Sequence, residues 1–228
     1  MGRALLLSFV VVAAVIVPSS ARAQVSVWLQ EGVSGYGVSS SIGLSNGETD
    51  LGVEVGYSYR GSLELDLDLG WAHADGDPAI SGSDVDGLGV GGGVQFHPVK
   101  QSKELPLSVN LQAAYRNLFY FSQILDDAGL SVSGWQTGIS AGVYRFVPLA
   151  PRIGVTPEVD AGWLHSSATL SRGSDKMTDT SEDIQVVVAA NFAFLDGAGR
   201  IWGVAPKITF GSLATSFGLS VNFVMPKQ

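Results

Sequence analysis

Hydrophobic and polar residues alternate with a period of two along most of the chain. From Leu63 to His73, four leucines, a tryptophan and a histidine occupy every second position, and Glu64, Asp66 and Asp68 lie among the residues between them. This alternation predicts a β-strand with one apolar face and one polar face. The stretch alone leaves two interpretations open, because the leucines would fill the core of a soluble protein but would face lipid in a membrane barrel.

About ten segments share the pattern, each about 8–12 residues long, whereas a strand of a soluble protein usually has ~5–6 residues. Their length suits the ~9–11 residues that a tilted strand needs to cross a bilayer. We therefore predict an all-β fold, an antiparallel up-and-down transmembrane β-barrel of about ten strands, with eight or twelve as alternatives. The segments are 36–44, 50–60, 63–73, 87–96, 107–116, 135–143, 153–163, 183–194, 202–210 and 216–223.

The links between these segments differ in length, and short links alternate with long ones. This predicts short turns on the periplasmic side and long loops outside. Residues 25–33 also alternate, and they are either the start of a bent first strand or a separate periplasmic segment. The short or intermediate links are 60–62, 98–105, 148–152 and 196–199, and the longer polar links are 75–86, 118–131 and 166–181.

Two features favour an apolar face that meets lipid. The polar face is rich in Gly and Ser, which suits a narrow lumen better than a solvated surface. Aromatic residues gather near the ends of the segments, as in the girdles of membrane barrels. We expect seven of them to act as membrane-interface anchors: Tyr57, Tyr59, Trp71, Tyr115, Trp163, Phe210 and Phe223.

Charged residues on the polar face are expected to meet in the lumen. Because unpaired charges in a narrow interior are costly, we favour a paired, plugging network over an open path. The alternative is a water-filled acidic lumen, which would favour cations. The expected lumen charge network is Glu54, Arg60, Glu64, Asp66, Asp68, Arg116, Glu158, Asp160 and Lys207.

Composition excludes several kinds of chemistry. The net charge is −8 and no basic stripe is present, which argues against a nucleic-acid partner. The chain has no cysteine, so it has no disulfide, thiol nucleophile or Cys-bound zinc. No nucleotide or metal motif occurs, and we expect neither a cofactor nor a metal. The acidic loop with Asp75, Asp77, Asp84 and Asp86 lacks EF-hand spacing and is interpreted as a solvated loop rather than a Ca²⁺ site.

The first 23 residues differ from the rest of the chain. Arg3 precedes an apolar run from Ala4 to Val17, and a small-residue cleavage pattern ends at Ala23. This order is typical of a secretory signal peptide, and about 14 apolar residues fall short of the ~20 of a spanning helix. We predict a signal peptide at 1–23 and a single barrel domain at 24–228.

The signal pattern, the glycine-rich strands and the ending SFGLSVNFVMPKQ resemble the small outer-membrane β-barrel proteins of Gram-negative bacteria, the group of the OmpA-like and OmpW-like barrels. The resemblance extends over residues 24–228 and concerns pattern rather than a motif. It implies localisation in the outer membrane, contact with its lipid and lipopolysaccharide, and insertion by the barrel assembly machinery. We expect a monomer. The C-terminal strand of that family ends in Phe. This chain departs from that pattern, because five residues follow Phe223.

We expect no enzymatic activity, and instead a structural or surface-interaction role or a narrow pore for small solutes. One alternative is a soluble periplasmic barrel of the lipocalin-like kind, with the leucines facing inward. The other alternative is an outer-membrane barrel enzyme.

Two short patterns carry the enzyme alternative. His165-Ser166-Ser167 resembles the His-x-Ser of outer-membrane lipid A deacylases, with Asp179 or Glu182 as the third member, although Ala168-Thr169-Leu170 stands where that family has Asn-Ala-Gly. This resemblance implies His as the base for Ser, with an acid that orients the His. His73 with Asp75 and Asp77 weakly resembles the carboxylate and Asp–His groups of omptin proteases.

Overall fold

The computed structural model describes residues 27, 29, 31–45, 48–74, 84–212 and 215–227, with the backbone alone for residue 124. The predicted signal peptide at 1–23 lies outside these residues, as do Asp75 and Asp77 of the acidic loop.

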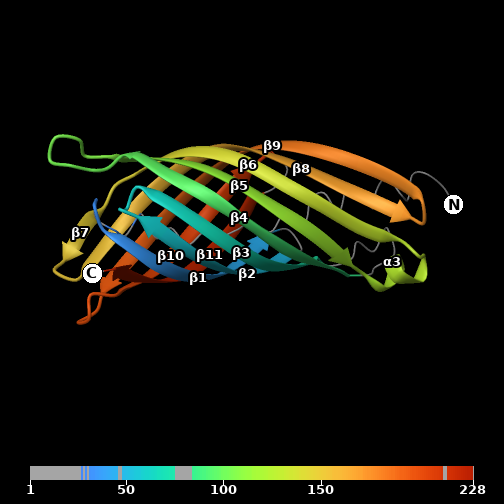
Figure 1. Ribbon diagram of the computed structural model, residues 1–228, viewed down its shortest axis with the longest axis horizontal. Coiled ribbons are helices and arrows are strands. Elements are labelled where there is room, and N and C mark those ends of the chain that lie inside the picture. The colour runs from blue at the N-terminus through green and yellow to red at the C-terminus, as the bar shows by residue number, and fades with distance from the viewer. Residues whose placement is uncertain are drawn as a thin grey trace.

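Ten strands form a closed antiparallel barrel (Figure 1). Each strand pairs with its neighbours in the chain, and the ring closes where β1 pairs with β11 and β6 pairs with β8. The short β7 (Val147–Ala150) is additional and pairs with the first residues of β8. The predicted fold class and the count of about ten strands are therefore confirmed. The ring consists of β1 (Ser34–Ser45), β2 (Glu48–Tyr59), β3 (Leu63–Ala74), β4 (Val85–Val99), β5 (Ser108–Phe121), β6 (Ser131–Tyr144), β8 (Ile153–Arg172), β9 (Asp175–Leu195), β10 (Ile201–Gly211) and β11 (Thr215–Lys227).

The leucine row of β3 lies on the outside of the barrel. Leu67 is 68 % exposed, whereas Glu64 on the opposite face is 1 % exposed. The same parity holds around the ring, where large apolar side chains face outward and small or polar ones face inward. This arrangement excludes the soluble alternative with inward-facing leucines, because the interior is polar and the surface is apolar.

Two of the predicted links are different in the structure. The prediction of a loop at 166–181 was wrong, because β8 and β9 continue through it as paired strands up to a tight turn at Gly173 (φ 59°). The Thr169 and Thr178 hydroxyls are 3.0 Å apart across this hairpin. The segment 118–131 holds the end of β5 and a short helix, α3 (Gln123–Asp127).

The barrel wall is not equally tall all round. β9 pairs with β10 only from Leu195 to Gln185, while it pairs with β8 as far as Asp175. In Figure 1 the β8–β9 hairpin therefore extends beyond β10 and β11, at the end of the barrel where α3 lies. The short links 60–62, 100–107 and 196–200 lie at the opposite end, and we refer to the two ends as the hairpin end and the short-link end.

Apolar clusters occupy the inside of the barrel at both ends. At the hairpin end, Leu125 of α3 is 2 % exposed and packs with inward residues of β3, β4, β5, β6 and β8. At the short-link end, Leu29 is 4 % exposed and packs on Ala193 and Val224, and the Gly32 N–H donates to the Arg60 carbonyl at 3.0 Å. Val27, Leu29 and residues 31–33 are therefore not part of the first strand. None of the described helices is long and apolar enough to span a membrane.

Candidate functional site

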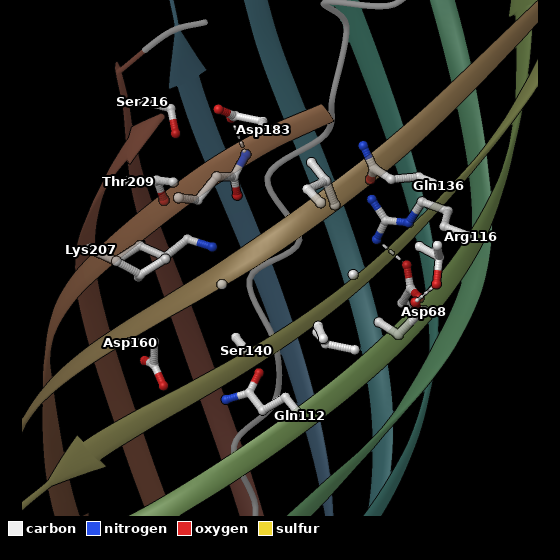
Figure 2. A pocket seen from close by; sticks show the side chains of 18 of the residues that line it. Asp68, Gln112, Arg116, Gln136, Ser140, Asp160, Asp183, Lys207, Thr209 and Ser216 are labelled. Atoms are coloured by element: carbon white, nitrogen blue, oxygen red, sulfur yellow. Dashed lines mark hydrogen bonds and ion pairs between the residues drawn. The ribbon is translucent and has the colours of Figure 1, made fainter. Parts of the chain in front are cut away.

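A cavity of about 240 Å³ lies in the lumen and reaches the rim at the hairpin end, where Ser45, Glu48 and Ser216 line it. Every strand of the ring except β4 contributes lining residues, so the cavity belongs to the barrel as a whole. Figure 2 shows several of these side chains pointing into it. Among the described residues, its charged lining consists of seven acids and two cations: Glu48, Asp50, Glu54, Asp66, Asp68, Asp160, Asp183, Arg116 and Lys207. The remaining polar lining is made of serines, threonines and amides.

Arg116 of β5 and Asp68 of β3 form an ion pair inside the cavity (Figure 2). The register places Gly91 of β4 directly between them, opposite Asp68 on one side and Arg116 on the other. A Cβ atom at Gly91 would lie 2.7 Å from the Asp68 Oδ2 atom, so only glycine leaves room for the pair to meet across the middle strand. Gly87, Gly89 and Gly93 occupy the neighbouring inward positions, so β4 contributes no side chain to the cavity lining.

Glycines make room for the other inward charges in the same way. A Cβ at Gly218 would lie 2.7 Å from the Lys207 Cε atom, and a Cβ at Gly142 would overlap the Asp160 carboxylate. Lys207 points into the cavity from β10, on the side opposite Arg116 (Figure 2). The glycine-rich polar face seen in the sequence is therefore the space that the inward charges occupy.

The rim of the cavity near β9 is fixed by Asp183. Its Oδ1 atom accepts a hydrogen bond from the Ser212 backbone N–H at 2.7 Å, and its Oδ2 atom accepts one from Gln185 Nε2 at 3.0 Å. These bonds join the end of β10 to β9 at the point where their pairing stops. The acid therefore has a structural role as well as a place in the lining.

Below the cavity, toward the short-link end, buried side chains form a polar layer. Asn110 Nδ2 and Asn191 Nδ2 donate to the two Glu158 carboxylate oxygens at 2.8 and 3.1 Å. The Tyr144 hydroxyl lies 2.9 Å from His97 Nδ1. Five members of this layer are at most 1 % exposed: Ser58, Glu64, Asn110, Thr156 and Glu158. The layer and the cluster around Leu29 fill the lumen toward the short-link end with buried side chains.

Lys100 lies just outside β4, beside this layer. Its Nζ atom is 5.7 Å from the centre of the Tyr144 ring. Burial lowers the pKa of Lys100 from 10.5 to about 8, and the negative charges of Glu64 and Glu31 oppose that shift. Desolvation is therefore stronger here than the attraction of the nearby acids.

The structure places eight of the nine expected lumen charges inside the barrel, and two of them, Arg116 and Asp68, form an ion pair. The prediction for Arg60 was wrong. β2 ends at Tyr59, and Arg60 lies exposed in the following turn with a φ of 53°, its guanidinium 5.3 Å from the Tyr59 ring centre. The expected segment at 50–60 therefore ends one residue later than the strand itself.

The sequence reasoning missed three cavity acids, Glu48, Asp50 and Asp183. Asp50 and Asp183 share the inward parity of their strands, so the signal was present. Glu48 lies two residues before Asp50 and therefore outside the expected segment at 50–60. The seven expected anchors all lie on outward-facing positions, with Tyr57, Tyr59 and Phe223 toward the short-link end, and Trp71 and Phe210 toward the hairpin end.

A second group of polar residues lies on the outer surface of β8 and β9. The His165 ring lies between Trp135 and Trp163, with centroids 5.1 and 5.7 Å away, and its Nδ1 atom is 3.6 Å from Glu182 Oε1. Ser167 lies two residues further along the same face. Of the two acids considered with this histidine, Glu182 is the one that faces it, because Asp179 pairs with Ala168 on the inward parity.

The other histidine at this end of the barrel has a different partner. His73 Nδ1 lies 2.9 Å from Asp86 Oδ1, and its ring stacks on Trp71. Within the described part of the chain, no group of three or more His, Asp or Glu residues is arranged to hold a metal ion.

No protein-family model and no curated protein matches the sequence. Among solved structures, the chain is similar to the N-terminal β-barrel domain of Pseudomonas aeruginosa OprF, at 13 % identity and a TM-score of 0.36 over 86 % of this chain and 98 % of that one. It is also similar to outer membrane protein AlkL in lipid bilayers, at 13 % identity and a TM-score of 0.41 over 93 % of this chain and 95 % of that one. These neighbours are outer-membrane β-barrels. At these values the likeness concerns the fold alone.

Proposed function

We propose that this chain is a non-enzymatic outer-membrane barrel whose lumen takes up small cationic solutes from the outside and holds them in a closed-ended cavity. The observation that carries the proposal is the lining of that cavity, in which seven carboxylates face two cationic side chains. A low-dielectric wall strengthens the field of such a lining and concentrates cations within it.

The placement in a membrane rests on the outer surface. Large apolar side chains are exposed around the whole ring, and Ile184 of β9 is 71 % exposed. A continuous apolar surface of this kind is unfavourable in water. A closed barrel leaves no strand edge unpaired within the hydrocarbon region, as a bilayer requires. An exported chain with these two properties suits the outer membrane.

Cysteine chemistry offers a direct test, because the chain has no cysteine of its own. Ser216→Cys puts a single thiol in the cavity lining, and Ala198→Cys puts one in an exposed short link as the matched control. Both variants are treated in detergent with a cationic and an anionic methanethiosulfonate reagent. We expect the ratio of cationic to anionic reaction rates to be at least about tenfold larger at position 216. Equal ratios at the two positions would contradict the proposal.

A further pair of variants assigns the effect to the acids. Asp66→Asn and Asp160→Asn remove two cavity carboxylates while keeping the size of each side chain. In the Ser216→Cys background, the combined change is expected to lower the rate ratio toward that of position 198. Heat-modifiable migration on a gel confirms that each variant remains folded.

A second candidate function is ester hydrolysis on the outer surface, with Ser167 as nucleophile, His165 as base and Glu182 as the acid that orients it. The observation in its favour is the His165–Glu182 pair, which lies beside Trp163 and on the face that carries Ser167. In the described part of the chain, no hydrogen bond joins Ser167 to His165.

Lipid analysis of cells that express the protein tests this candidate. Ser167→Ala is compared with Ser166→Ala, whose side chain faces the lumen and is the matched control. If the chain hydrolyses lipid esters, free fatty acid and deacylated lipid are expected in cells that express the unmodified chain or Ser166→Ala. These products are expected to be absent in cells that express Ser167→Ala. An unchanged lipid profile with the unmodified chain would exclude the candidate.

A further inference from the structure

In the part of the chain that the structure describes, the outer part of β9 has one strand edge without a pairing strand. Residues 175–184 pair with β8 on one side, while the pairing with β10 stops at Gln185. Among the described residues, no strand pairs with this stretch on its other side. Backbone N–H and C=O groups along such an edge can pair with a further strand.

The unpaired edge lies beyond the apolar belt. The outward-facing apolar row of the hairpin ends at Trp163 and Ile184, which are opposite each other. The next outward residues toward the turn are all polar: His165, Ser167, Thr169 and Ser171 on β8, and Glu182, Thr180, Thr178 and Lys176 on β9. Residues 175–180 are all exposed. In a membrane, this edge would therefore stand in water on the outer side.

The hairpin is held in place before any partner arrives. β6 pairs with β8 as far as Ser171, and Leu170 is buried in the apolar cluster that includes Leu125 of α3. The Thr169–Thr178 hydroxyl pair joins its two strands near the turn. Because the edge is already ordered, a binding peptide would not have to offset the entropy of ordering it.

The charges along the edge indicate which kind of strand would fit. Asp175 and Asp179 lie exposed on one face, four residues apart, and Lys176 is the one cationic side chain in the stretch. Asp183 continues the row but is buried at the cavity rim and accepts a hydrogen bond from Ser212. A second copy paired antiparallel along the same edge would bring these acids close to each other, which is unfavourable. Met177 and Ile184 are the sole large apolar residues of the stretch, so an apolar partner has little to contact.

We propose that the β9 edge at residues 175–184 binds an extended basic peptide segment by strand addition. Backbone hydrogen bonds supply the pairing, and lysine or arginine side chains of the peptide face the acid row. Apart from Ser181 and Asp183 at its inner end, this stretch lies outside the lumen cavity, and the proposal does not depend on the cavity taking up cations.

The probe is a ten-residue peptide of alternating lysine and threonine, titrated into the folded barrel in nanodiscs and followed by calorimetry. Two further peptides carry N-methyl groups on alternate backbone amides, one at the odd positions and one at the even positions. We expect the parent peptide and one methylated peptide to bind, and the other to lose binding, because strand addition uses every second amide. The proposal would be overturned if the parent peptide did not bind. It would also be overturned if the two methylated peptides behaved alike, with both binding or both failing to bind.

Variants of the barrel locate the site. Asp175→Asn combined with Asp179→Asn is expected to weaken binding several-fold, up to about tenfold, as for two exposed charge pairs. Asp66→Asn combined with Asp160→Asn changes the cavity alone and is expected to leave peptide binding unchanged. If the cavity variant weakened peptide binding and the hairpin variant did not, the peptide would bind in the lumen. That result would overturn the assignment to the β9 edge.

Discussion

At the scale of single residues, the barrel depends on glycines that stand between charges. Gly91 separates Asp68 from Arg116 across three strands, and a Cβ there would also lie 2.6 Å from the Tyr115 carbonyl oxygen. The backbone contact cannot be relieved by rotation of a side chain. A larger residue at position 91 must therefore displace either the ion pair or the strand.

We expect Gly91→Val to lower the free energy of unfolding by about 1–3 kcal/mol, the usual cost of overpacking. The measurement is the temperature at which the compact band on a gel converts to the unfolded one. Gly197→Ala is the control, because a Cβ at Gly197 meets no atom within 4 Å. Equal transition temperatures for the two variants would mean that β4 can move away from the pair.

Lys100 gives the barrel a pH dependence in alkaline solution. Its pKa is about 8 in the folded chain and 10.5 in the unfolded chain, so between these values the unfolded chain binds more protons. The free energy of unfolding therefore rises as the pH increases from 8 to 10.5. Lys100→Gln removes this titrating group and is expected to give a smaller rise, measured by urea unfolding in detergent at pH 7.5, 9 and 10.5. If the free energy of unfolding rose equally in the unmodified chain and in Lys100→Gln, the pH dependence would come from other groups.

At the scale of elements, the β8–β9 hairpin differs from the other connections. Because β9 has a partner on one side from 175 to 184 and on both sides further on, we expect two patterns of amide hydrogen exchange. Amides from 185 to 195 are expected to be mostly protected, and those from 175 to 184 to be protected at alternate positions. Solution NMR in detergent measures both. A uniformly unprotected stretch from 175 to 184 would mean that the hairpin is a loop.

The hairpin also shows what the sequence could and could not predict. Alternation predicted the ten strands and the inward side of each, because one face meets lipid and the other a narrow lumen. Residues 166–181 were expected to be a loop, since their serines, threonines and charges lack an apolar row. Their strand conformation comes from distant contacts, with β6 along one side and Leu170 in the cluster under α3.

The candidate site was predictable in its residue types but less so in its pairings. The inward parity of Glu54, Asp66, Asp160 and Lys207 follows from the alternation alone. Which acid meets Arg116 depends on the register of β3, β4 and β5, and the register depends on turns that the sequence leaves uncertain by a residue. Arg60 shows the consequence of such an uncertainty, because a strand that ends one residue earlier removes it from the lumen.

At the scale of the whole molecule, two groups of buried side chains fill the lumen toward the short-link end, and we interpret them as two closures. The polar layer around Glu158 lies directly below the cavity, and the cluster around Leu29 lies at the very end of the strands. Each closure is made by different segments, the first by strands of the ring and the second by a segment that precedes them. Removal of one of them therefore leaves the other in place.

This arrangement predicts how conductance depends on the two closures. We expect the unmodified barrel and Leu29→Ala to be silent in a planar bilayer, because the polar layer still fills the lumen in both. Asn110→Ala combined with Glu158→Ala opens the layer but leaves Leu29 in place, and it is also expected to be silent. The variant with all three changes joins the acidic cavity to the short-link end and should show channel steps.

The ion selectivity of those steps follows from the cavity. With seven carboxylates against two cations in its lining, the triple variant is expected to pass K⁺ in preference to Cl⁻, seen as a shift of the reversal potential in a salt gradient. Heat-modifiable migration shows whether the triple variant is folded. Steps in Leu29→Ala alone would mean that the polar layer does not seal the lumen. Anion preference in the triple variant would contradict the proposed binding of cations, since ions would then cross the same cavity against its charge.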